Sequence, residues 1–102
     1  LAGAGGPPPS VQLALETARP NPSSESAALR FTLPRPGHAR LVVLDVAGRR
    51  MRTLVDGPLV AGSHEVAWDG RDAGGAPAPA GLYWARLEAA GEAVARRLVR
   101  IP

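Results

Sequence analysis

Large apolar side chains alternate with small or polar ones along most of this chain. The alternation is clearest where Leu29, Phe31 and Leu33 are separated by Arg30 and Thr32. A period of two residues is typical of a β-strand with one buried face. Apolar segments of this kind predict six further short strands, at 11–15, 39–46, 50–55, 64–68, 82–88 and 93–101.

Glycine and proline separate these segments. Glycine adopts the positive φ angles that tight turns need, and proline removes a backbone donor from a strand. Short strands at this spacing, punctuated in this way, are typical of a sandwich. The segment 89–98 is rich in alanine and resembles a helix, but Gly91 and its position after the strand at 82–88 favour a strand. The sequence therefore predicts an all-β fold, a seven-strand antiparallel sandwich.

Both tryptophans and the only tyrosine lie within the stretch 64–87, so we expect the core to be built there. Taking the inward position of each predicted strand gives the expected core: Leu29, Phe31, Leu41, Val43, Val66, Trp68, Tyr83 and Leu87. The strand at 39–46 is unusual because its opposite face is apolar too. This pattern predicts a strand that is covered on both sides or that lies at an interface.

The loop between Trp68 and Gly81 holds two acidic residues among glycines and prolines. Asp69 and Asp72 can accept hydrogen bonds from nearby backbone N–H groups and so stabilise the turn. They are also a weak candidate for a Ca²⁺ site, but two carboxylates fall short of the six to eight oxygens that Ca²⁺ takes. We favour turn stabilisation and expect no metal and no other cofactor.

Length and composition limit the alternatives. A chain of 102 residues accommodates one domain, and without cysteine it has no disulfides and no thiol chemistry. We expect residues 1–10 (LAGAGGPPPS) to be a Gly/Pro-rich linker and residues 11–102 the folded domain. A linker at the start implies that something is attached before it. No apolar run approaches ~20 residues and no signal peptide opens the chain, so we expect no membrane span.

The residues provide no catalytic arrangement. Ser63 and His64 are adjacent in a predicted strand, so their side chains point to opposite faces and cannot act as nucleophile and base. His38 and His64 have no cysteine or nearby acidic pair with which to complete a zinc site. The glycines at 3–6 follow no strand and open no helix, which disqualifies them as a phosphate loop. We expect the protein not to be an enzyme.

All twelve basic residues are arginine, and the formal net charge is +3. A candidate basic surface consists of Arg49, Arg50, Arg52, Arg96, Arg97 and Arg100. Nucleic-acid binding would favour aromatic residues interleaved with such a surface for stacking, and the sequence shows none there. We expect no nucleic-acid partner and interpret the arginines as a solvated face, with attraction to anionic surface polysaccharide as the alternative.

An ordered series of motifs resembles a known family. The motifs are Arg19-Pro20-Asn21-Pro22, Leu29-Arg30-Phe31-Thr32-Leu33-Pro34, Leu44-Asp45-Val46-Ala47-Gly48-Arg49, Thr53-Leu54, Ala61-Gly62-Ser63-His64, Trp68-Asp69-Gly70-Arg71-Asp72, Gly75 and Gly81-Leu82-Tyr83. They resemble the C-terminal immunoglobulin-like domains similar to that of the flagellar hook-capping protein, and also type IX secretion C-terminal sorting domains. The resemblance covers about residues 11–102. The chain departs from it at Leu44, where the family has an aromatic residue, and at Ser23, where Phe is common.

The resemblance implies an immunoglobulin-like sandwich at the end of a larger bacterial protein that is extracellular or on the cell surface, where it serves sorting, anchoring or assembly. Its partners would be secretion or surface-anchoring machinery, or neighbouring domains of the same protein. Two alternatives are a structural subunit that packs on its neighbours, favoured by the two-sided apolar strand, and a carbohydrate-binding module, for which only Trp84 is a candidate platform.

The run from Arg96 to Ile101 resembles the basic-then-apolar ending of the sorting domains. We therefore expect Arg96, Arg97 and Arg100 to be exposed residues that a partner contacts. The alternative is an ordinary edge strand whose arginines discourage aggregation.

Overall fold

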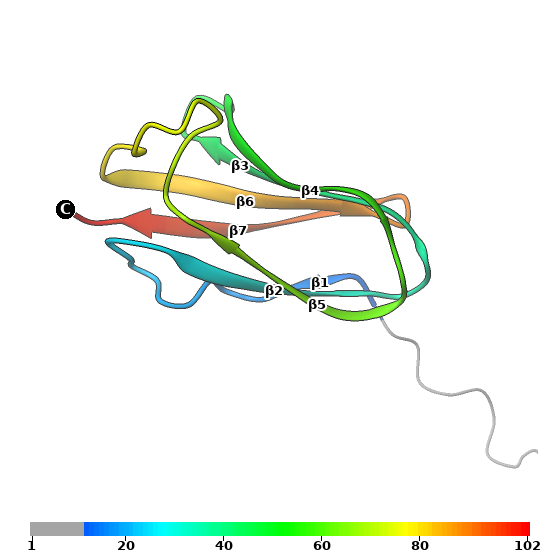
Figure 1. The fold of residues 1–102 in the computed structure, drawn as a ribbon. Coiled ribbons are helices and arrows are strands. Elements are labelled where there is room, and N and C mark those ends of the chain that lie inside the picture. The colour runs from blue at the N-terminus through cyan, green and yellow to red at the C-terminus, as the bar shows by residue number, and fades with distance from the viewer. Residues whose placement is uncertain (1–11) are drawn as a thin grey trace, which may run out of the picture.

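The protein consists of two facing β-sheets in a computed structural model that describes residues 12–102 (Figure 1). The expected linker at 1–10 and Val11 lie outside the described residues. The strands are β1 (Ala14–Leu15), β2 (Ala27–Leu33), β3 (Gly37–Asp45), β4 (Arg50–Leu59), β5 (Gly62–Trp68), β6 (Gly81–Ala89) and β7 (Glu92–Arg100).

The three-stranded sheet has the order β1-β2-β5, and the four-stranded sheet has the order β4-β3-β6-β7. Every pair of neighbouring strands is antiparallel. The prediction of an all-β fold with seven antiparallel strands is therefore confirmed. The segment 89–98 is strand, and its turn has positive φ at both Ala90 (54°) and Gly91 (76°), the geometry of a tight two-residue hairpin.

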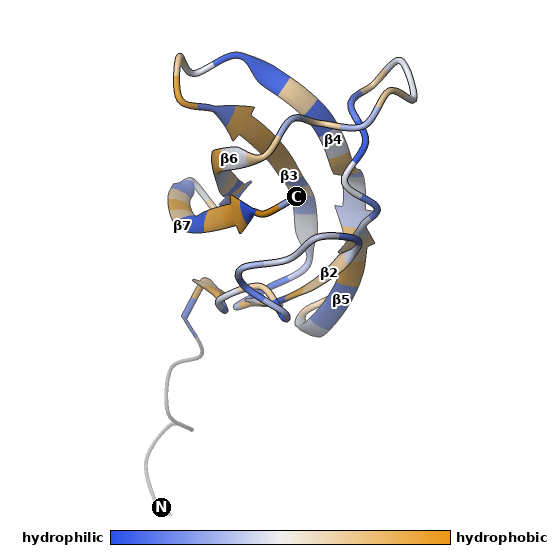
Figure 2. Ribbon diagram, turned by 90° about the vertical axis from the view of Figure 1, so that its left-hand side faces the viewer, coloured by the Kyte–Doolittle hydropathy of each residue, from blue (hydrophilic) through white to orange (hydrophobic). Residues whose placement is uncertain are grey.

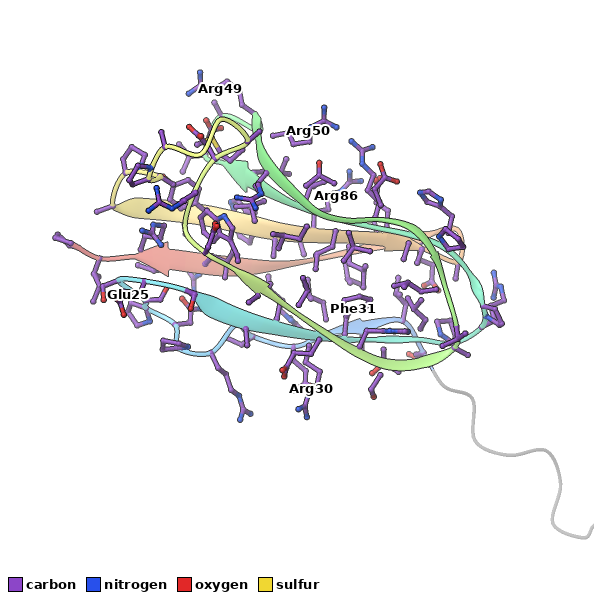
Figure 3. The ribbon with its side chains drawn as sticks, in the orientation of Figure 1. Glu25, Arg30, Phe31, Arg49, Arg50 and Arg86 are labelled. Atoms are coloured by element: carbon purple, nitrogen blue, oxygen red, sulfur yellow. The ribbon has the colours of Figure 1, made fainter. Side chains whose placement is uncertain are left out.

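The core lies between the two sheets. Phe31 points into the space between them, whereas its neighbour Arg30 points away, as the strand period requires (Figure 3). Seven side chains expected in the core are almost inaccessible to solvent, namely Leu29, Phe31, Leu41, Val43, Trp68, Tyr83 and Leu87. Val66 is only half-buried, because it packs against the core from β5, which lies at the edge of its sheet.

Two strands, β4 and β1, differ most in length from the expectation. The strand expected at 50–55 continues to Leu59, because Pro58 lies on an edge strand, where its missing N–H interrupts no sheet. Irregularities in the β3–β4 register explain why the apolar residues of β4 do not alternate strictly. Conversely, of the described residues 12–15 in the strand expected at 11–15, only Ala14 and Leu15 pair with β2. The alternating apolar residues of this segment reflect burial and not strand pairing, because Leu13 is buried without belonging to a strand.

Candidate functional site

The three arginines of β7 that were expected to contact a partner have different environments. Arg100 is buried, contrary to that expectation, with 9% of its surface exposed. Its Nε donates to the carbonyl oxygen of Ala78 at 3.2 Å, and its Nη1 donates to that of Glu25 at 3.0 Å. The guanidinium lies over the ring of Trp68. Because Arg100 has the same parity as buried Leu98, its side chain faces the interior, where it connects two loops.

Arg96 and Arg97 are both exposed, but only one is bonded through its side chain. The Nε of Arg96 donates to the carbonyl oxygen of Leu15 at 2.7 Å and so connects the edges of the two sheets. The Arg97 guanidinium makes no hydrogen bond or ion pair with any residue from 12 to 102. Arg97 is therefore the arginine of β7 that is most available to a partner.

The outer edge of β7 is partly closed by the segment that precedes β2. Asn21 donates from Nδ2 to the carbonyl oxygen of Arg97 and accepts from the N–H of Val99, both at 2.9 Å. Ser23 N donates to Val99 O, and Ile101 N donates to Ser23 O. The pattern of apolar residues gives no indication of this role of Asn21, whose side chain takes the place of a strand partner. An amide side chain between two prolines, which cannot themselves donate to a neighbouring strand, is the sequence signal for it.

The acidic residues of the loop 69–80 hold turns. The Asp69 carboxylate accepts from Arg71 N at 3.0 Å and from Arg52 Nη1 at 3.1 Å. Asp72 accepts from Gly74 N at 2.9 Å and Ala76 N at 3.0 Å. Within residues 12–102, no three His, Cys, Asp or Glu side chains gather in a way that could hold a metal ion.

The histidines have structural contacts. His38 lies at the start of β3, and its Nε2 is 2.7 Å from the Asp56 carboxylate. His64 stacks on Phe31 with the ring centroids 5.4 Å apart, and its Nε2 lies 2.7 Å from the carbonyl oxygen of Val60. Ser63 precedes His64 on β5 and is exposed, so the two side chains alternate as expected.

Two ionisable groups have shifted pKa values, and both belong to the frame of the domain. The Asp45 carboxylate has a lowered pKa because it accepts hydrogen bonds from the backbone N–H and side chain of Arg49 and from Ala47 N, although desolvation partly opposes the shift. Burial raises the pKa of Tyr83, whose hydroxyl donates to Pro79 O at 2.6 Å.

The six arginines of the candidate basic surface do not form one patch. Arg49 is paired with Asp45, Arg52 with Asp69, and Arg100 is buried. Arg49 and Arg50 project away from the three-stranded sheet, on the far side of the molecule from Arg30 (Figure 3). The described part of the chain contains no helix that is long and apolar enough to cross a membrane.

Comparison with known proteins agrees with this architecture. The model of the FlgD Ig-like domain family matches residues 16–93. The chain belongs to this family. The resemblance seen in the sequence is therefore confirmed, and the immunoglobulin-like character of the sandwich follows from it.

Two solved structures share the fold. The crystal structure of dimeric latent PorU from Porphyromonas gingivalis matches with a TM-score of 0.64 and 21% identity, over 89% of this chain and 10% of that chain. FlgD from P. aeruginosa matches with a TM-score of 0.55 and 20% identity, over 88% of this chain and 76% of that chain. A search of curated proteins gave no match. This chain thus spans only a tenth of the length of the PorU chain.

Proposed function

We propose that this domain is the non-catalytic C-terminal module of a larger bacterial protein, secreted or on the cell surface, and that it serves sorting, anchoring or assembly. The family supports the proposal, because the same fold occurs in a tenth of the solved PorU chain and in about three quarters of the solved FlgD chain. The resemblance of the motifs to sorting domains supports an extracellular or cell-surface location. Secretion or anchoring machinery, or neighbouring domains, would be the partners.

One observation supports this proposal most strongly: polar side chains that could otherwise bind a metal or a ligand form hydrogen bonds within the fold. Asp69 and Asp72 accept turn N–H groups, and Arg100 is bound to loop carbonyls. In residues 12–102, no three His, Cys, Asp or Glu side chains gather in a way that could hold a metal ion. The exposed surface includes apolar and cationic side chains, Trp84 and Arg97 among them, which suit recognition of a partner.

The structure also narrows which arginine a partner would contact. Arg100 is excluded by its burial, and Arg96 is engaged with Leu15 O through its Nε. Arg97 has an exposed guanidinium, so we assign partner contact chiefly to Arg97, with the terminal nitrogens of Arg96 as a secondary contact.

The experiment is to fuse a passenger protein to the complete 102-residue chain in the native host and to measure the fraction of passenger that external protease reaches. The matched control carries an unrelated immunoglobulin-like domain of similar size. We expect surface exposure with this domain and retention inside the cell with the control. Equal exposure of both fusions, or exposure of the passenger alone, would contradict the proposal.

A further inference from the structure

The face of the four-stranded sheet that turns away from the three-stranded sheet, here called the outer face, has a row of four residues across all its strands. Arg50 of β4 lies opposite Leu44 of β3, Leu44 lies opposite Trp84 of β6, and Trp84 lies opposite Arg97 of β7. Directly paired residues lie on the same face of a sheet. The row therefore places an aromatic and an aliphatic side chain between two arginines.

The apolar surface continues from this row towards the end of β7. Leu82 lies opposite Val99 on the same face, and both are half-buried. Val46 and Ile101 directly follow the ends of β3 and β7, and they are 72% and 45% exposed. Trp84 is 39% exposed. We call Leu44, Val46, Leu82, Trp84, Val99 and Ile101 the apolar end of the outer face. In the ribbon of Figure 2, which is coloured by residue and not by face, β3 and β7 carry hydrophobic segments in orange.

The remaining half of the outer face is charged, and its charges are paired. Glu88 lies 3.0 Å from Arg86 and 3.9 Å from Arg40. By contrast, neither Arg50 nor Arg97 has an acidic partner within ion-pair distance among residues 12–102. The apolar end thus carries two cations that the domain itself does not neutralise.

We propose that the apolar end of the outer face is a docking surface for another protein, whose complementary patch has an apolar centre with carboxylates on two opposite sides. Its composition is that of an interface core, in which Trp and Arg are enriched and acidic residues and Lys are depleted. Exposed apolar residues that adjoin one another on a small domain mark interaction sites. Arg50 and Arg97 lie three strand spacings apart, about 14 Å, which sets the separation of the carboxylates.

Charge distinguishes this partner from a second copy of the chain. Two copies packed through this surface would bring arginines from both copies together with no carboxylate between them, and such like-charge contacts are unfavourable. Polysaccharide also fits this surface poorly. The apolar end of the outer face has a single aromatic ring, and the aliphatic side chains around it offer no hydrogen bonds to sugar hydroxyl groups.

The inference rests on the proposed role as a recognition module and names the chemistry of its partner. The test is selection from a displayed library of random peptides against the complete chain, with counter-selection against Trp84→Ser. We expect enriched peptides with Asp or Glu on both sides of an apolar centre. Binding of a selected peptide should weaken more than about 30-fold in Trp84→Ser. It should weaken about threefold to tenfold in each of Arg50→Gln and Arg97→Gln, and decrease with added salt in the wild type.

Val60→Ser is the matched control, because Val60 is 69% exposed but follows β4, away from the outer face. It should bind as the wild type does, and all variants should keep the wild-type circular dichroism spectrum. Peptides without acidic residues would overturn the proposal, as would equal binding to Trp84→Ser. Dimerisation in sedimentation experiments that Trp84→Ser abolishes would assign the surface to a second copy instead. Alginate binding that Trp84→Ser abolishes would assign the surface to acidic polysaccharide. These assays use the isolated chain, so their failure leaves the passenger experiment as a separate test of the proposed function.

Discussion

The guanidinium of Arg100 lies over the ring of Trp68, 5.4 Å from its centroid. Trp68 ends β5 and Arg100 ends β7, so the contact joins the two sheets at one end of the sandwich. The same guanidinium donates to Glu25 O and Ala78 O, which come from two different loops. One buried cation therefore fixes two loops and an aromatic side chain to the last strand.

Arg100→Gln should destabilise the domain by about 1 to 3 kcal/mol, because it removes the cation over Trp68 and leaves buried carbonyl oxygens unpaired. Arg97→Gln is the control and should change the free energy of unfolding by no more than about 0.5 kcal/mol, since the Arg97 side chain is exposed. Urea unfolding followed by tryptophan fluorescence measures both. Equal stability of the two variants would show that the buried contacts of Arg100 contribute nothing.

Gly70→Ala should be more harmful than Gly75→Ala. Both glycines have positive φ, 79° and 89°, so each substitution strains the backbone by about 1 to 2 kcal/mol. Only at Gly70 would a Cβ collide with the Arg100 guanidinium, whereas a Cβ at Gly75 meets open space. We expect a total loss of about 2 to 4 kcal/mol for Gly70→Ala. Thermal unfolding compares the pair, and indistinguishable losses would argue against close packing of Arg100 on Gly70.

Asn21→Ala should weaken the closure of the β7 edge. The substitution leaves Arg97 O and Val99 N without their side-chain partners, at a cost of about 1 to 2 kcal/mol. An opened strand edge also promotes pairing between molecules, so self-association in sedimentation experiments should increase. Asn21→Asp keeps the acceptor for Val99 and loses the donor to Arg97, and we expect an intermediate loss. A variant as stable and as monomeric as the wild type would refute this role.

The lowered pKa of Asp45 should make the free energy of unfolding depend on pH. Its pKa in the folded protein lies below the ordinary 3.8, because the carboxylate accepts hydrogen bonds from Arg49 and Ala47. The resulting stabilisation is fully present above the unfolded value and is lost as the pH falls through the folded value. As the pH falls from about 5 to about 2, the free energy of unfolding should decrease more steeply for the wild type than for Asp45→Asn. Parallel curves for the two proteins would contradict the prediction.

The strands could be predicted because burial on one face imposes a period of two. Leu29, Phe31 and Leu33 fill the core in the predicted register. The same reasoning placed Val42 and Leu44 on a second apolar face, where Val42 is buried and Leu44 half-buried. A pattern along one strand does not tell which strands lie beside it. The row from Arg50 to Arg97 became visible only when the sheet order was known.

The environment of the arginines could not be predicted for a similar reason. Alternation assigns Arg100 to the same face as Leu98. An arginine at the end of an edge strand is nevertheless ordinarily exposed. Its burial depends on carbonyl groups from residues 25 and 78, far away in the sequence. The role of Asn21 likewise depends on a strand more than seventy residues later.

In our proposal the domain acts by recognition, to which Arg97 contributes, while Arg100 stabilises the fold. The most direct measurement is the protease-accessible fraction of a passenger fused to the complete chain carrying Arg97→Gln, beside a fusion carrying Arg30→Gln. Arg30 is an exposed arginine on the opposite sheet. With both domains folded, we predict that Arg97→Gln leaves most of the passenger inside the native host and that Arg30→Gln exports it normally. Normal surface exposure of the Arg97→Gln fusion would contradict the account.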